Sequence, residues 1–170
     1  MTPGPGTSAP ADFVAAWLLD AAMWGPERAR EEWETAGMTP LRAGGSFCAL
    51  RVPVALVEAA AADTDPATVD AYLGNVLDRA PAFRCNTGRW FYVLVRPTVA
   101  SWWDSGGEVE CVGEGHEIGV PRLDLVEHPG RTASYWAVPM TRPSQLGTGQ
   151  GVSQMVTAAR SVMAKQEGTP

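Results

Sequence analysis

The stretch Trp90–Val95 (Trp-Phe-Tyr-Val-Leu-Val) constrains the fold of this chain more than any other segment. In a β-strand, successive side chains point to opposite faces of the sheet, and here both alternating sets are apolar. A strand that is apolar on both faces is typical of a sheet centre that is covered twice. A glycine-containing turn precedes it and predicts a hairpin of residues 83–85 with residues 89–96. We therefore expect a sheet whose central strand lies between two layers.

Helices and further strands are predicted on either side of this hairpin. Apolar residues at helical spacing predict helices over residues 11–23, 26–37, 54–62 and 152–166, and one that starts at Pro66 behind the N-cap residue Asp65. Shorter apolar runs predict strands over residues 47–52, 108–112, 116–120 and 134–138, with 108–112 and 116–120 paired to each other. The pattern predicts an α+β fold with a central, mostly antiparallel or mixed sheet of five to six strands flanked by helices.

A chain of 170 residues suits one domain, and we expect three parts along it. Residues 1–10 consist mostly of Pro, Gly, Ser and Thr, which predicts a disordered leader. Residues 11–139 hold the predicted domain. Residues 140–170 are expected to form a linker and a C-terminal helix that packs on the domain or extends from it.

The composition excludes several classes of protein. A net charge of −6 and an isoelectric point near 4.9 argue against a general binder of phosphate backbones, which would be basic. Three cysteines without close spacing indicate a reduced compartment rather than a disulfide scaffold. No apolar stretch reaches the roughly 18–20 residues of a membrane span. We therefore expect a cytoplasmic protein that does not enter a membrane.

Several segments occur in the order found in a known family. They are the helical entry with Ala15, Trp17, Leu18 and Trp33; Gly45-Ser46-Phe47 followed by Arg51-Val52-Pro53; Gly88-Arg89 with Trp90–Val95; Glu110-Cys111-Val112-Gly113 with His116-Glu117-Ile118-Gly119-Val120-Pro121; and Trp136-Ala137-Val138-Pro139. In this arrangement the chain resembles actinobacterial proteins related to the primase/polymerase (Prim-Pol) N-terminal domain. Twelve Arg against the single Lys165 are typical of the high-GC genomes of such bacteria.

The resemblance implies a fold built for two-metal nucleotidyl transfer, which needs carboxylates that converge on two cations. Active members of the family carry an Asp-x-Asp or Asp-x-Glu strand end and a His on the strand after the glycine turn. Here the matching positions hold Arg51-Val52-Pro53 and Trp90. Since a guanidinium repels a cation and proline has no side-chain donor atom, we expect no catalytic residue, no metal and no cofactor.

The resulting hypothesis is a non-catalytic, Prim-Pol-like module that acts as a regulatory or accessory protein through protein–protein contacts. A protein partner or self-association is expected. Trp102 and Trp103 are the predicted partner-binding residues, because exposed tryptophan is a frequent anchor of protein interfaces. Burial of one of the two under the helices is the competing interpretation.

The alternative is a protein that binds a nucleotide or single-stranded nucleic acid and has lost polymerase chemistry. Arginines interleaved with aromatic residues on a sheet are typical of such binding surfaces. The residues in question are Arg51, Arg84, Arg89, Trp90 and Tyr92. The acidic isoelectric point favours a structural role for them, with the aromatic rings in the core and the arginines around it.

Three further groups have the chemistry of a site but a simpler structural explanation. A run of titratable side chains could hold a cation or an acid–base pair, and is more typical of a solvated hairpin: Asp104, Glu108, Glu110, Glu114, His116 and Glu117. A zinc site would need Cys48, Cys85, Cys111 and the histidines His116 and His128, but no close Cys pair exists. Residues 147–151 (Gly-Thr-Gly-Gln-Gly) could bind a phosphate on their backbone N–H groups, but they lack the lysine of a P-loop. A flexible hinge before the last helix is the favoured interpretation.

Overall fold

The strand β4 (Trp90–Val95) lies at the centre of a five-stranded sheet, as its two apolar faces predict. The strand order is β5-β2-β4-β3-β7, and every pairing is antiparallel. The hairpin of β3 (Ala82–Arg84) with β4 is confirmed. The predicted strand over residues 47–52 is β2 (Cys48–Pro53), which flanks β4 on its other side.

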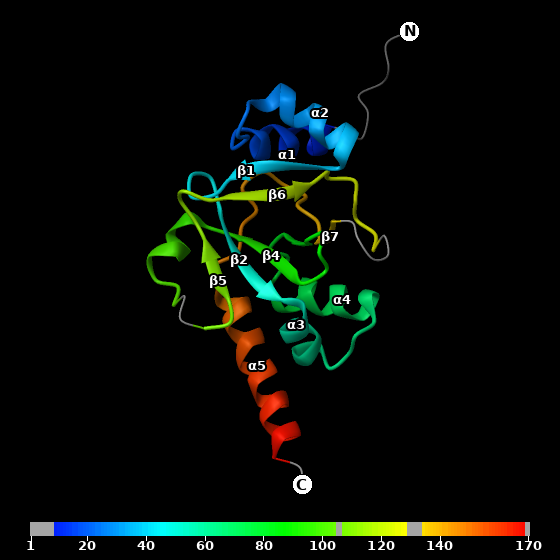
Figure 1. Ribbon diagram of the computed structural model, residues 1–170, viewed down its shortest axis with the longest axis vertical. Helices are drawn as coiled ribbons and strands as arrows, with labels where there is room; N and C mark the ends of the chain where they lie inside the picture. The colour runs from blue at the N-terminus through cyan, green and yellow to red at the C-terminus, as the bar shows by residue number, and fades with distance from the viewer. Residues whose placement is uncertain (1–8, 105–106, 129–133, 169–170) are drawn as a thin grey trace.

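The computed structural model describes residues 9–104, 107–128 and 134–168 (Figure 1). Its helices are α1 (Ala9–Leu19), α2 (Pro26–Ala36), α3 (Val54–Ala61), α4 (Pro66–Val76), the 3₁₀ helix η1 (Pro97–Ser101) and α5 (Gln150–Glu167). The strands not yet introduced are β1 (Met38–Arg42), β5 (Glu110–Val112), β6 (Glu117–Pro121) and β7 (Tyr135–Val138). This is the predicted α+β class, with the strands divided between two antiparallel sheets.

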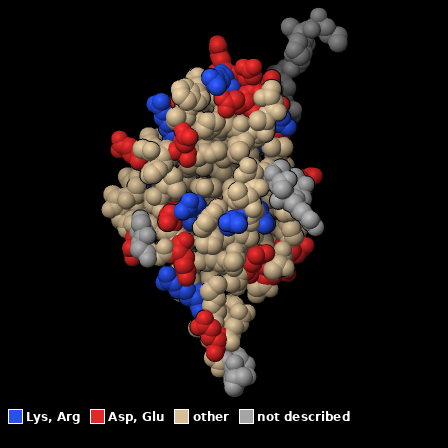
Figure 2. All heavy atoms as spheres, viewed as in Figure 1, with Lys and Arg blue, Asp and Glu red and all other residues tan. Residues whose placement is uncertain are grey.

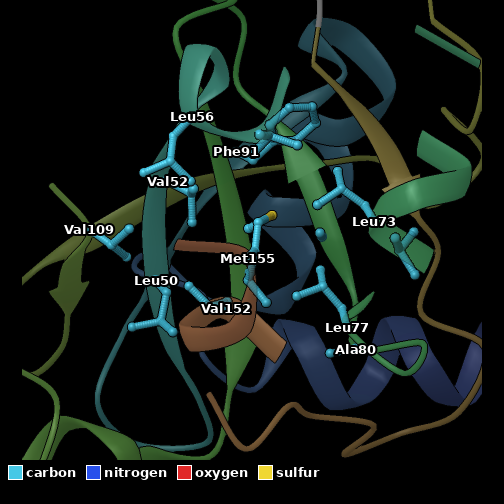
Figure 3. Close-up of a cluster of buried hydrophobic side chains, with 14 of the residues drawn as sticks. Leu50, Val52, Leu56, Leu73, Leu77, Ala80, Phe91, Val109, Val152 and Met155 are labelled. Atoms are coloured by element: carbon cyan, nitrogen blue, oxygen red, sulfur yellow. The ribbon is translucent and has the colours of Figure 1, made fainter. Parts of the chain in front are cut away.

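Different layers cover the two faces of the five-stranded sheet. On one face, Leu50, Val52 and Phe91 pack with side chains of α3, α4 and α5 such as Met155 (Figure 3). On the other face, a second apolar cluster joins the sheet to α1, α2 and the ribbon formed by β1 and β6. The sheet is therefore the middle of three layers, and a side chain's position along a strand decides which layer it meets.

Two buried tryptophans connect the ribbon to helix α2 and to the main sheet. The indole Nε1 of Trp33 in α2 donates to the carbonyl oxygen of Val120 at 2.9 Å. The Nε1 of Trp136 in β7 donates to the carbonyl oxygen of Pro121 at 3.1 Å. Because a buried indole N–H without an acceptor would destabilise the fold, these bonds fix β6 against both a helix and the main sheet.

Several local signals are confirmed at the helix ends. The side chain of Asp65 accepts a hydrogen bond from the backbone N–H of Thr68, and Pro66 begins α4, as expected of an N-cap followed by proline. Helix α2 begins at Pro26 and ends before Gly37, whose φ of 75° is in the left-handed region. Helix α5 packs against α3, and its C-terminal half extends beyond the rest of the molecule in Figure 1.

The expected pairing of residues 108–112 with 116–120 is wrong. Strand β5 pairs with β2, with Arg51 opposite Glu110, whereas β6 pairs with β1. The turn between β5 and β6 therefore carries the chain from one sheet to the other. Gly44 makes this crossing possible, because a Cβ there would lie 2.6 Å from the backbone of Glu114. Each strand gains a more deeply buried neighbour than the other strand would provide.

Two other boundaries differ from the expectation. Strand β1 was not predicted, because it contains Pro40. This proline is tolerated in a two-stranded ribbon, and its carbonyl oxygen accepts a hydrogen bond from the backbone N–H of Met23. Helix α1 begins at Ala9, inside the predicted leader, and residues 1–8 lie outside the described part of the chain.

Candidate functional site

Arg51 lies near the end of β2, where the family resemblance would place acidic residues. Its Nη2 is 2.5 Å from the Oε2 of Glu110 on the neighbouring strand β5. Its guanidinium carbon lies 4.5 Å from the centre of the Trp90 ring on β4, within the range of a cation–π contact. Tyr92 is the residue directly opposite Arg51 on β4. The arginine is therefore positioned by its own neighbours on two adjacent strands.

The electrostatics around Arg51 are those of a partly desolvated cation. Its Nε is buried and has no hydrogen-bond partner among the described residues. Burial raises the pKa of the Tyr92 hydroxyl, and the Arg51 charge partly opposes this rise. A positive charge held at the strand end makes this position unfavourable for a divalent cation, because like charges repel.

The predicted nucleic-acid residues are only partly brought together. Arg51, Trp90 and Tyr92 share one face of the sheet, since Arg51 is opposite Tyr92 and Trp90 lies two residues before Tyr92 on β4. Arg84 is on the other face, opposite Phe91, with its guanidinium carbon 5.7 Å from that ring. Arg89 is exposed in the hairpin turn. A continuous basic floor made of all three arginines is therefore not formed.

Arg84 instead lies beside a polar contact that the sequence did not reveal. The hydroxyl of Tyr135 on β7 donates to Oδ1 of Asp70 on α4 at 2.9 Å. Burial raises the pKa of Asp70, and the bond to Tyr135 and the charge of Arg84 oppose this rise. Burial and the nearby Asp70 charge raise the pKa of Tyr135. The contact ties α4 to β7, which are too far apart in sequence for any local signal.

Trp102 and Trp103 differ in burial, as the competing interpretation allowed for one of them. Trp102 is 55% exposed, whereas Trp103 is half-buried and donates its Nε1 to the carbonyl oxygen of Val109 at 3.0 Å. Their ring centres are 5.8 Å apart. A groove of about 340 Å³ runs between this pair and α5, with Val156 and Arg160 on the helix side. We call this feature the Trp102 groove.

The acidic run does not converge on one point. Glu110 is bound to Arg51, whereas Glu108 lies 3.9 Å from Arg160 on α5. Glu114, His116 and Glu117 line a separate open cavity of about 720 Å³, together with Asp20 and Arg42. All five of these side chains are exposed, which agrees with a solvated surface.

Two of the three cysteines, Cys48 and Cys111, are neighbours, and Cys85 lies on a different element. Cys48 and Cys111 lie on the neighbouring strands β2 and β5, and Cys85 follows β3 in the hairpin turn rather than lying in the strand. Burial raises the pKa of Cys48, and burial together with the Cys48 thiol raises that of Cys111 to about 11. Such thiols stay protonated near neutral pH and are poor nucleophiles and ligands. In the described part of the chain, no three His, Cys, Asp or Glu residues are grouped to hold a metal ion.

The glycines around the start of α5 have a packing role. A Cβ on Gly151 would lie 2.3 Å from the carbonyl oxygen of Val76, at the end of α4. A Cβ on Gly147 would lie 2.9 Å from the Cβ of Ala80. The N-terminus of α5 thus meets the carbonyl end of α4, where a phosphate would be repelled.

Comparison with models of protein families, with curated proteins and with solved structures gives no match for this chain. None of the helices in the described ranges has the length and apolar composition needed to cross a bilayer.

Proposed function

We propose that the protein is a non-catalytic, Prim-Pol-like module that acts as a regulatory or accessory factor through contacts with another protein. The observation that carries the proposal is the exposure of Trp102 at the edge of a groove. A tryptophan side chain that is 55% exposed leaves a large apolar area in contact with water. Burial of that area against a partner would contribute favourable free energy to binding. The fixed ring of Trp103 beside it provides a rigid floor.

The state of Arg51 supports the non-catalytic part of the proposal. Metal-dependent nucleotidyl transfer needs a cluster of carboxylates, and Glu110, which lies opposite Arg51 on β5, is already bound to the Arg51 guanidinium. The proposed protein therefore uses the fold as a scaffold for binding surfaces.

Affinity capture with matched baits tests this function. We expect a protein to be retained in stoichiometric amount by the parent chain and by Trp24→Ala, but not by Trp102→Ala. Trp24 is the matched control because it is 63% exposed and lies between α1 and α2, away from the groove. Equal retention by both variants, or no stoichiometric partner together with a monomeric parent chain, would contradict the proposal.

A second candidate function is the binding of a nucleotide or single-stranded nucleic acid. It is favoured by the position of Arg51, Trp90 and Tyr92 on one half-exposed sheet face. Figure 2 shows Lys and Arg side chains gathered in the middle of the view, over β2 and β4, in a molecule that is otherwise acidic. The bond of Arg51 to Glu110 weakens this candidate, because the carboxylate neutralises the charge that a phosphate would need.

This candidate predicts a salt-sensitive gel shift with single-stranded DNA and a rise in melting temperature with nucleotides. Glu110→Gln should strengthen the binding, since it frees the guanidinium. Unchanged melting with all nucleotides and no retarded strand at low salt would exclude it.

A further inference from the structure

We draw no further inference here: the strongest candidate, the Trp102 groove beside α5, is lined by charged side chains that already have partners within the chain, and nothing in the structure shows what covers it.

Discussion

The two faces of β2 and β4 differ in what they bury. On the face toward α3, α4 and α5, Leu50, Val52 and Phe91 are fully buried among other apolar side chains. On the opposite face, one end of the same two strands carries Arg51 and Trp90, which are half-buried. Arg51 contacts the Trp90 ring and is bound to Glu110. Neighbouring residues of one strand thus belong to a packed core and to a partly open polar surface.

The contrast shows which part of the sheet serves stability. The Nε of Arg51 is the one buried side-chain nitrogen or oxygen that lacks a partner among the described residues, and an unsatisfied buried donor costs about 1–3 kcal/mol. The face toward α3, α4 and α5 has no such atom in the same described set. The face toward α3, α4 and α5 is therefore optimised for packing. The end of the sheet at Arg51 tolerates the free-energy cost of an unsatisfied donor, which an apolar side chain there would avoid.

The largest expected effect comes from truncating a buried side chain on the face toward α3, α4 and α5. Phe91→Ala should lower the free energy of unfolding by about 3–5 kcal/mol, because it leaves a large cavity beneath the helices. The adjacent Trp90→Ala should cost about 1–2 kcal/mol, since its ring is already half exposed. Urea unfolding followed by far-UV circular dichroism measures both. Equal losses would show that the open end is as tightly packed as the core.

A second pair of variants tests the packing of the helical layer. Gly151→Ala should lower the free energy of unfolding by about 1–3 kcal/mol, because its Cβ would collide with the backbone of Val76 and Leu77. Gly74→Ala, in α4, has no atom within 4 Å of the added Cβ and should raise stability by about 0.5–1 kcal/mol through helix propensity. Thermal melting should therefore shift in opposite directions for the two variants. A rise for both would place the end of α4 farther from α5.

The polar contact between α4 and β7 should make the free energy of unfolding depend on pH. The pKa of Tyr135 is raised above its ordinary value of 10.0, so the folded state holds this proton more tightly than the unfolded state. The resulting stability is complete below pH 10 and is lost as the pH rises above it. The free energy of unfolding should fall as the pH rises from 10 to 11, and the fall should be smaller in Tyr135→Phe.

At pH 7 the same variant isolates the hydrogen bond. Tyr135→Phe should cost about 1–1.5 kcal/mol there, because the half-buried Asp70 loses a donor. A parent and a variant with the same pH profile would mean that Tyr135 ionises as it does in the unfolded chain.

The smallest expected effect concerns the open end. Arg51 and Glu110 are 31% and 55% exposed, so water and salt screen their attraction. A double-mutant cycle of Arg51→Met and Glu110→Gln should give a coupling of about 0.5 kcal/mol that decreases in 1 M NaCl. A coupling above about 2 kcal/mol that salt does not change would show a desolvated pair and remove the contrast between the two faces.

The parts of the fold that could be predicted are those with local causes. Alternating apolar residues in Trp90–Val95 identify the central strand, and Asp65 with Pro66 identifies the start of α4. The pairing of β5 with β2 could not be predicted in this way. It depends on which strand edges remain free after the core has formed, and residues 110–112 contain no signal for that choice.

The candidate site shows the same limit. The contact of Arg51 with Trp90 and Glu110 follows from the registers of strands that are far apart in sequence. Arg84 falls on the opposite face because the hairpin register places it beside Phe91, which the turn sequence alone did not fix. The list of candidate residues came from the sequence, whereas their grouping required the structure.

The crossing of the chain between the two sheets has a consequence for the order of folding. Helix α2 and strand β1 are synthesised early, yet the indole of Trp33 bonds to Val120, which is 87 residues away. Closing so long a loop is entropically slow, so the ribbon should assemble after the hairpin of β3 and β4. Until β6 emerges from the ribosome, the edge of β1 that pairs with it stays open, and such an unpaired strand edge is prone to aggregation.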